Sequence, residues 1–265
     1  MRYALSLPNV DDAAAHVRLA EAADASGWDG VFLWDHLHMI REYRLRVLDP
    51  WVLLGAMAAR TERVRLGALV TPVARRRPWK LAKEIVTLDH LSGGRAVVGV
   101  GLGEPGTDEF EMFGESGDPR VRAAKLDEGL AILDAVFRGE PFVFEGEHFR
   151  VDAELLPPPV QRPRPPVWVA AMSAHRRPRE RALRWDGIAP VGANGEPMSP
   201  DDLAAIVTSL GPLPEGFDVV ATAMDDVEPE AYAEAGATWL VWSSWPVPGW
   251  YERLYALAEA GPPAR

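Results

Sequence analysis

The sequence contains no cysteine, which excludes disulfide bonds, thiolate catalysis and cysteine-ligated metal sites. It has no apolar run near the ~18–20 residues that a transmembrane helix requires, so we expect no membrane partner. Positive charge is in deficit, because the formal net charge is −11, and this argues against a nucleic-acid partner. Since a strand pattern begins within the first few residues, we expect no signal peptide and predict a cytoplasmic protein.

Length and composition indicate an ordinary globular chain. The 265 residues are enough for one (β/α)8 barrel or for two small domains. Hydrophobic residues make up 48% of the chain and charged residues 25%, so a sizeable core is expected.

The stretch 61–103 has the pattern of a βαβ unit. A strand-like run at 64–70 is followed by a loop that ends at Pro78, a helical run at 79–91, a glycine turn and a second strand-like run at 95–100. Because crossovers of this kind are right-handed, the two strands should lie parallel in one sheet.

The same alternation extends along the whole chain. Eight strand-like runs are expected, at 3–7, 30–34, 64–70, 95–100, 167–171, 187–191, 217–223 and 238–243. Eight helical runs follow them, at 12–26, 50–60, 79–91, 120–137, 176–184, 201–210, 229–235 and 250–260. Eight alternations in this length predict an α/β fold of the (β/α)8 TIM-barrel type.

One short insertion interrupts the alternation between the fourth helix and the fifth strand. It covers about 139–166 and combines a hairpin at 142–151 with a proline-rich linker at 157–166. We predict a single domain over 1–265 that includes this insertion.

Several segments of this chain resemble a known family. The segments are LGALVTPVARRRP (66–78), LAKEIVTLDHLSGGR (81–95), VVGVGLG (97–103) and, later, PPPVQRPRPPVWVAAMS (157–173) and AEAGATWLV (233–241). Their order and sequence resemble the signature of the luciferase-like monooxygenase superfamily, whose members are TIM barrels that use FMN or the deazaflavin F420. The resemblance implies the same fold, a cofactor of this class and a homodimer.

His36 is the best candidate for a catalytic residue, because active sites of barrels lie at the carboxyl ends of the strands. A neutral imidazole at that rim can take a proton from a substrate hydroxyl, although a histidine that only caps the second strand is an equal alternative. F420-dependent alcohol dehydrogenases of the family have an Asp-His pair here. The resemblance therefore implies a general base in His36 and a cofactor contact in Asp35, with His38 as a neighbour able to substitute.

Glu104 directly follows the glycine-rich end of the fourth strand. A carboxyl group there can act as general acid if burial raises its pKa, and the alternative is a helix cap that binds nothing. F420-dependent sugar-phosphate dehydrogenases of the family resemble the chain at this position. Their tryptophan after the Asp-His pair is replaced by Ile40 here, which argues against a sugar-phosphate substrate.

The resemblance also assigns a set of cofactor-binding residues. In the family, the turn after the fifth strand offers backbone N–H groups to the cofactor phosphate, and an ordinary strand-to-helix cap is the alternative. A non-proline cis peptide bond, here between Leu69 and Val70, is expected behind the central ring of the cofactor. The full set is Asp35, Leu69, Val70, Thr71, Gly103, Thr107, Ala170, Ala171, Met172 and Ser173.

Two further patterns bear on the site. The run Arg75, Arg76 and Arg77 could bind an anionic cofactor tail, and solvation of all three is the favoured interpretation. No metal-ligand spacing such as HxH or HExxH occurs, so no metal site is predicted.

The function predicted from these observations is that of an oxidoreductase which transfers a hydride between F420 and a small organic substrate. The alternatives are an FMN-dependent monooxygenase that uses reduced flavin and oxygen, and a non-catalytic flavin-binding protein. A metal-dependent barrel enzyme is a weaker alternative. The sequences of the loops at the barrel mouth do not indicate the substrate.

Overall fold

The computed structural model describes residues 1–172, 176–192 and 195–264. Within these residues, nine strands form one parallel sheet in the order β3-β2-β1-β11-β10-β9-β8-β5-β4. Their bounds are β1 (Arg2–Leu7), β2 (Gly30–Leu33), β3 (Arg65–Ala68), β4 (Thr71–Pro72), β5 (Val98–Gly101), β8 (Val167–Met172), β9 (Gly187–Val191), β10 (Asp218–Thr222) and β11 (Trp239–Ser243).

The sheet closes on itself because its two outer members, β3 and β4, follow each other in the chain; β3 lies within the predicted strand 64–70, and β4 begins directly after it. β3 pairs with β2, whereas β4 pairs with β5. The peptide bond between them, Leu69 to Val70, is cis, which confirms the prediction. The barrel therefore has eight strand positions, one of which β3 and β4 share, and the predicted TIM-barrel fold is confirmed.

The spaced glycines of β5 are explained by close packing against β3 and β4. A Cβ atom added at Gly99 would lie 2.4 Å from the carbonyl oxygen of Ala68, and one added at Gly101 would lie 2.7 Å from Cγ2 of Val70. Only glycine leaves room for this approach. The run therefore serves barrel closure.

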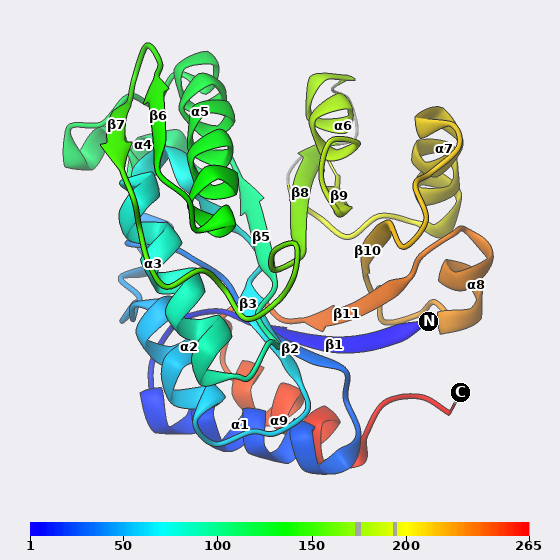
Figure 1. The fold of residues 1–265 in the computed structure, drawn as a ribbon. Coiled ribbons are helices and arrows are strands. Elements are labelled where there is room, and N and C mark those ends of the chain that lie inside the picture. Colours follow the sequence, from blue (N-terminus) through cyan, green and yellow to red (C-terminus); the bar gives the residue numbers. More distant parts are fainter. Residues whose placement is uncertain (173–175, 193–194, 265) are drawn as a thin grey trace.

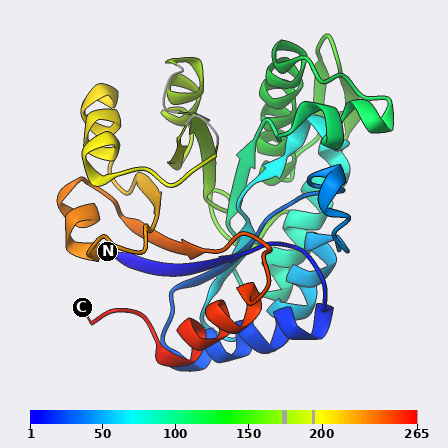
Figure 2. The same ribbon diagram turned by 180° about the vertical axis from the view of Figure 1, so that it is seen from behind.

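One main helix follows each barrel strand in the described part of the chain. The helices are α1 (Ala13–Ser26), α2 (Pro50–Ala58), α3 (Pro78–Leu91), α5 (Pro119–Arg138), α6 (Arg176–Ala182), α7 (Pro200–Leu210), α8 (Pro229–Glu234) and α9 (Trp250–Ala260). In Figures 1 and 2, α1 and α9 lie side by side, so the last helix packs against the first and the outer ring is continuous there.

Local capping explains where several of these helices begin. The side chains of Asp12, Asp49, Asp118 and Ser199 each accept a hydrogen bond from a backbone N–H of the first turn. These bonds satisfy donors that have no partner within the helix.

The insertion between α5 and β8 contains the antiparallel hairpin β6 (Phe142–Glu145) and β7 (Arg150–Ala153). Glu128 on α5 fixes its turn by accepting hydrogen bonds from the N–H groups of Glu147, His148 and Phe149. The proline-rich segment that follows is held by Asp89 on α3, whose carboxylate accepts from the N–H groups of Val160 and Gln161.

The inside of the barrel is filled by a separate cluster of buried side chains. Its members come from most of the strands and are Ala4, Phe32, Val97, Trp168, Ala189, Val220, Trp239 and Val241. The rings of Phe32, Trp168 and Trp239 meet edge to face with centroids 5.2–6.0 Å apart. The barrel is therefore a packed core with two distinct ends.

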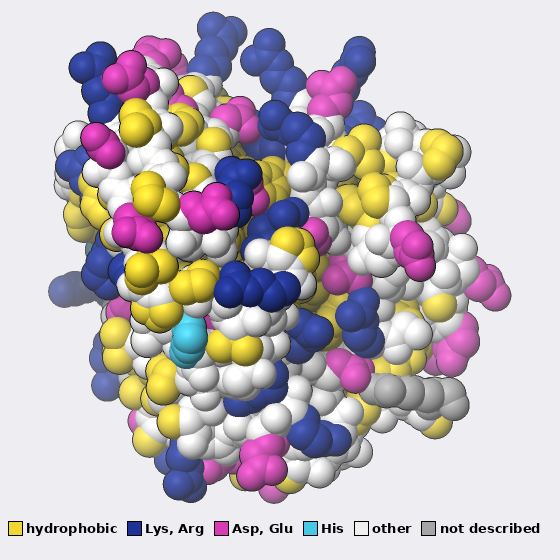
Figure 3. Space-filling model, in the orientation of Figure 1, with side chains coloured by type: hydrophobic (Ala, Val, Ile, Leu, Met, Phe, Trp, Pro, Cys, Tyr) yellow, Lys and Arg dark blue, Asp and Glu magenta, His cyan; other side chains and the backbone are white. Residues whose placement is uncertain are grey.

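Acidic, basic and apolar side chains are interspersed on the face shown in Figure 3, and dark blue side chains gather near its centre. Among the helices of the described residues, none combines the length and the apolar character that crossing a membrane requires.

Candidate active site

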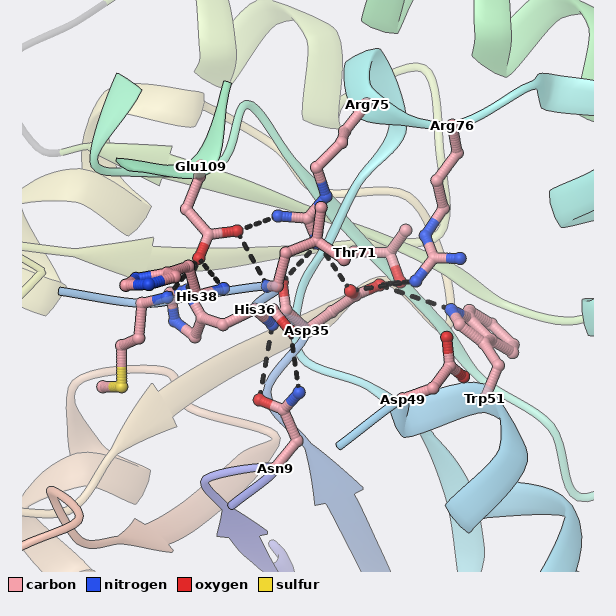
Figure 4. Close-up of polar contacts among 12 residues, drawn as sticks. Asn9, Asp35, His36, His38, Asp49, Trp51, Thr71, Arg75, Arg76 and Glu109 are labelled. Carbon is pink, nitrogen blue, oxygen red and sulfur yellow. Dashed lines mark hydrogen bonds and ion pairs between the residues drawn. The ribbon is translucent and has the colours of Figure 1, made fainter. Parts of the chain in front are cut away.

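His36 lies just beyond β2, and hydrogen bonds to its backbone and to its ring hold it in place. Asn9, at the end of β1, accepts from the N–H of His36 at 3.3 Å and donates to its carbonyl oxygen at 2.9 Å. The ring nitrogen Nδ1 lies 3.3 Å from Oε1 of Glu109, as Figure 4 shows. Because a carboxylate can only accept, Nδ1 carries the proton, and in the neutral ring Nε2 keeps a free lone pair.

The imidazole is accessible as well as oriented. Its side chain is 23% exposed, and within the described residues Nε2 has no hydrogen-bond partner. The ring of Trp34 lies 6.0 Å from it and in turn contacts Trp245, after β11, at 5.5 Å. His36 therefore presents a proton-accepting nitrogen beside an aromatic wall.

Glu109, at the end of the short helix α4 (Gly106–Glu109), organises the loop that carries His36. Its side chain is only 1% exposed. Its carboxylate accepts from the N–H groups of Leu37 at 3.0 Å, His38 at 3.0 Å and Met39 at 2.5 Å, and it also pairs with the guanidinium of Arg75.

These contacts keep Glu109 ionised. Burial by itself would raise the pKa of Glu109, but the hydrogen bonds from His36 and from the N–H of Leu37, together with the charge of Arg75, outweigh burial and lower the pKa from 4.5 to about 2. A buried permanent negative charge thus faces Nδ1 of His36.

The neighbouring carboxylate, Asp35, has no exposed side-chain surface. It accepts from Thr71 Oγ1 at 2.9 Å and from Trp51 Nε1 at 3.3 Å, and it forms ion pairs with Arg75 at 2.8 Å and Arg76 at 2.9 Å. In this structure the carboxylate faces the protein interior and holds the two arginines (Figure 4).

The interpretation of the arginine run as a solvated surface is wrong for two of its members. The side chains of Arg75 and Arg76 are only 5% and 16% exposed, because Arg75 lies between Asp35 and Glu109 and Arg76 between Asp35 and Glu84. Arg77 is exposed, as expected. A run of like charges in the sequence gave no sign of the two buried carboxylates that neutralise it.

Glu104 is not buried, although burial was the condition for its predicted role as a general acid. Its side chain is 60% exposed and pairs with Arg122 at 3.0 Å, and it also accepts from the N–H of Gly106 at 3.1 Å. The contacts match the alternative interpretation, a cap at the start of α4. Thr107 is exposed on the same short helix, and the carbonyl oxygen of Gly103 accepts from Arg122.

The predicted cofactor-binding residues of three strands meet around Gly101. Val70 and Ala170 flank it, since a Cβ atom added there would lie 2.7 Å from Val70 Cγ2 and 3.4 Å from Ala170 Cβ. Val70, Leu69, Ala170 and Met172 are half-buried, whereas Thr71 and Ala171 are buried. Ser173 lies outside the described residues.

These side chains fit a flat organic ring. The half-buried ones are apolar, and glycine at position 101 allows Val70 and Ala170 to lie close together on this surface. In the described part of the chain, Nδ1 of the nearby residue His38 is buried without a hydrogen-bond partner. The same residues contain no group of three His, Cys, Asp or Glu side chains that could hold a metal ion.

Comparison with known proteins adds to this geometry. A family model described as luciferase-like monooxygenase matches residues 2–240. The chain is 37% identical over 152 residues to an F420-dependent glucose-6-phosphate dehydrogenase of Nakamurella multipartita, covering 56% of this chain and 43% of that protein. It spans about half the length of the first curated relatives that it matches, 56% and 43%.

Two solved structures share the fold. An F420-dependent secondary alcohol dehydrogenase in complex with an F420-acetone adduct superposes with a TM-score of 0.77 at 17% identity, over 96% of each chain. The oxygenating constituent of 3,6-diketocamphane monooxygenase from Pseudomonas putida, in complex with FMN, has a TM-score of 0.67 at 20% identity, over 91% of this chain and 66% of that one. The family model matches most of this sequence, and the chain therefore belongs to the luciferase-like monooxygenase family.

Proposed function

We propose that this protein is an oxidoreductase that moves a hydride between F420 and a small organic substrate bearing a hydroxyl or carbonyl group. The observation that supports it best is the state of His36. Its Nδ1 is fixed by Glu109 at 3.3 Å and its ring is partly exposed at the carboxyl ends of the strands. Such a group can accept a proton from a substrate hydroxyl.

The residues divide into three roles. His36 Nε2 takes the hydroxyl proton, and Glu109 stabilises the imidazolium that results, because its carboxylate stays ionised beside Nδ1. Leu69, Val70, Ala170 and Met172 would hold the ring of the cofactor against the barrel. Thr71, Gly103, Thr107, Ala171 and Ser173 remain predicted contacts of the rest of the cofactor. When bound, F420 supplies the hydride acceptor or donor.

F420 is the first choice of cofactor for two reasons. The dehydrogenase from Nakamurella multipartita and the secondary alcohol dehydrogenase structure are both named as F420-dependent. The histidine also suits abstraction of a hydroxyl proton, which hydride transfer from an alcohol requires. FMN remains the alternative because a monooxygenase of the same fold was solved with it.

A paired titration tests the proposal. The purified protein is titrated with F420 and, separately, with FMN, followed by fluorescence and by absorbance, near roughly 420 nm for F420 and near about 370 and 450 nm for FMN. We expect F420 to bind at least about tenfold more tightly. Tighter binding of FMN would favour the monooxygenase, and binding of neither would contradict the proposal.

Two variants show whether binding occurs at this apolar surface. Ala170→Leu enlarges a half-buried side chain of the surface and should weaken cofactor binding, whereas Gly55→Ala, whose added Cβ would lie 4.0 Å from Leu91 of α3, should bind as the parent does. Turnover of candidate alcohols by the loaded protein then separates an enzyme from a non-catalytic binder.

The homodimer, the cytoplasmic location and the single domain over residues 1–265 stay predictions. Sedimentation equilibrium tests the first, fractionation of the source cells tests the second, and limited proteolysis tests the third.

A further inference from the structure

The end of the barrel opposite His36 contains a second cluster of charged side chains. A cavity of about 380 Å³ opens there, and its lining includes Arg2, Arg63, Arg65, Asp29, Trp28 and Trp239. These residues lie at or just before the starts of β1, β2, β3 and β11, which are neighbours in the sheet.

Two of the three arginines point along the barrel axis. Arg2 alternates with Ala4, a member of the cluster inside the barrel, and is in register with Trp239 of the same cluster. Arg65 alternates with Leu69, which packs against that cluster. Because side chains two residues apart on a strand share a face, Arg2 and Arg65 both face the barrel interior at its base.

The charge of Arg2 is neutralised within the protein. Its guanidinium pairs with Asp218 and stacks over the ring of Trp239 at 4.5 Å. The carboxylate of Asp218 also accepts from Trp168 Nε1 and Thr238 Oγ1, each at 3.0 Å. Asp218 is therefore fully engaged.

Arg63 and Arg65 lack such a partner. Arg65 donates one long hydrogen bond of 3.4 Å to Gln161, and Arg63 donates to the backbone carbonyl of Asp24. Neither forms an ion pair with any carboxylate of the described residues. Burial and the positive charge of Arg2 lower the pKa of Arg65, and the charges of Asp218 and Asp89 offset this only in part.

Trp239 also belongs to the lining of the cavity. Its side chain is completely buried, and in the part of the chain that the structure describes its Nε1 has no acceptor, as is also true of one nitrogen each in His38, Arg76, Arg122 and Arg164. The carboxylate of Asp29, the acidic member of the lining, accepts from the N–H of Tyr3 at 2.8 Å.

We propose that this cavity binds a phosphate group, either as free phosphate or as the end of a phosphomonoester. Arg63 and Arg65 form no ion pair within the described residues and outnumber the one carboxylate of the lining, Asp29, so the cavity keeps a net positive charge that suits an anion. Guanidinium is the side-chain group best suited to bidentate contacts with phosphate oxygens. The site is separated from the mouth by the packed aromatic core, so it is independent of the proposed redox site.

Calorimetric titration with inorganic phosphate, against sodium chloride of equal ionic strength, tests the site. We expect saturable binding of one phosphate per chain, weakened by at least about tenfold in Arg65→Met. The matched control is Arg60→Met, an exposed arginine that pairs with Glu21 outside the cavity and should bind phosphate as the parent does. Absence of saturable binding, or equal binding by Arg65→Met, would overturn the proposal.

Thermal unfolding distinguishes a ligand site from a structural arginine. At a tenfold excess over the Kd of the parent, phosphate should raise the Tm of the parent by about 3–6 °C and that of Arg65→Met by at most about a third as much. In chloride alone, Arg65→Met should be as stable as the parent, because no ion pair is lost. If this variant does not fold, Arg63→Met at the exposed rim provides the same test.

Titrations with two further ligands distinguish free phosphate from a phosphomonoester. Tighter binding of adenosine 5′-monophosphate than of inorganic phosphate assigns a phosphomonoester, and equal or weaker binding assigns free phosphate. Succinate that binds as tightly as phosphate would contradict the choice of ligand.

Discussion

The two ends of the barrel differ in whether their arginines form ion pairs within the protein. At the mouth, the carboxylates of Asp35 and Glu109 are buried and each is surrounded by donors, so the arginines beside them are neutralised by the protein itself. At the base, Arg63 and Arg65 form no ion pair with a carboxylate of the described residues.

The difference separates arginines that are ion-paired within the protein from arginines that are not paired within its described part. At the mouth, the ion-paired carboxylates can hold one reactive group, His36, in a fixed orientation. Excess charge at the base instead favours an external anion. Four predictions test this contrast, beginning with the largest effect.

His36→Ala should lower turnover by about 10²–10⁴-fold, with cofactor affinity changed by less than about threefold, because the base is lost while the ring-binding residues remain. Steady-state kinetics and a cofactor titration measure both quantities. The matched control is His38→Ala, two residues away, which should retain turnover. Equal losses in the two variants would remove His36 from the mechanism.

Glu109→Ala should lower the free energy of unfolding by about 3–5 kcal/mol, because it leaves a buried arginine and several backbone N–H groups without their acceptor. Urea unfolding measures the change. Glu111→Ala removes an exposed carboxylate two residues away and should stay within about 0.5 kcal/mol of the parent. A similar small change for Glu109→Ala would show that the contacts of Glu109 do not stabilise the mouth of the barrel.

The free energy of unfolding should also decrease at acidic pH, because Glu109 becomes protonated. Its pKa is about 2 in the folded protein and 4.5 ordinarily, so the unfolded chain binds this proton more tightly. The resulting stabilisation, about 3 kcal/mol, is complete above about pH 4.5 and is lost as the pH falls towards about 2. Urea unfolding at pH 5.5 and 3 should show about 2 kcal/mol more loss in the parent than in Glu109→Gln. Identical pH dependence in the two proteins would contradict the assignment.

The smallest effect is expected for Glu104→Gln, because that side chain is 60% exposed. Its ion pair with Arg122 should contribute less than about 1 kcal/mol, and turnover should change by less than about threefold. A hundredfold loss of turnover would support the prediction of Glu104 as a catalytic acid and would contradict the minor role expected from its exposure.

The fold was predictable because its signals are local. Apolar runs such as 30–34 and 167–171 mark strands that are covered on both faces, and the helical periods between them set the count of eight units. The position of His36 was predictable for the same reason, since a polar residue that follows a buried strand lies at the mouth.

The network around His36 was not predictable, because it depends on contacts between distant segments. Glu109 lies in an acidic loop without a period and meets His36 across 73 positions of the chain. Arg75 and Arg76 look like solvated residues until the fold brings Asp35 to them across 40 and 41 positions. Sequence pattern shows where a side chain lies along an element, and not which distant charge it meets.

In the proposed mechanism, Glu109 holds His36 with its proton on Nδ1 and its lone pair on Nε2. The most direct test is ¹⁵N NMR of the histidine rings at about pH 8, where a neutral imidazole reports its tautomer. The His36 signal is assigned by its absence in His36→Ala. We predict a protonated Nδ1 and an unprotonated Nε2, with the preference weakened in Glu109→Gln. A proton on Nε2 in the parent would contradict the account, because that nitrogen could then accept no proton from a substrate.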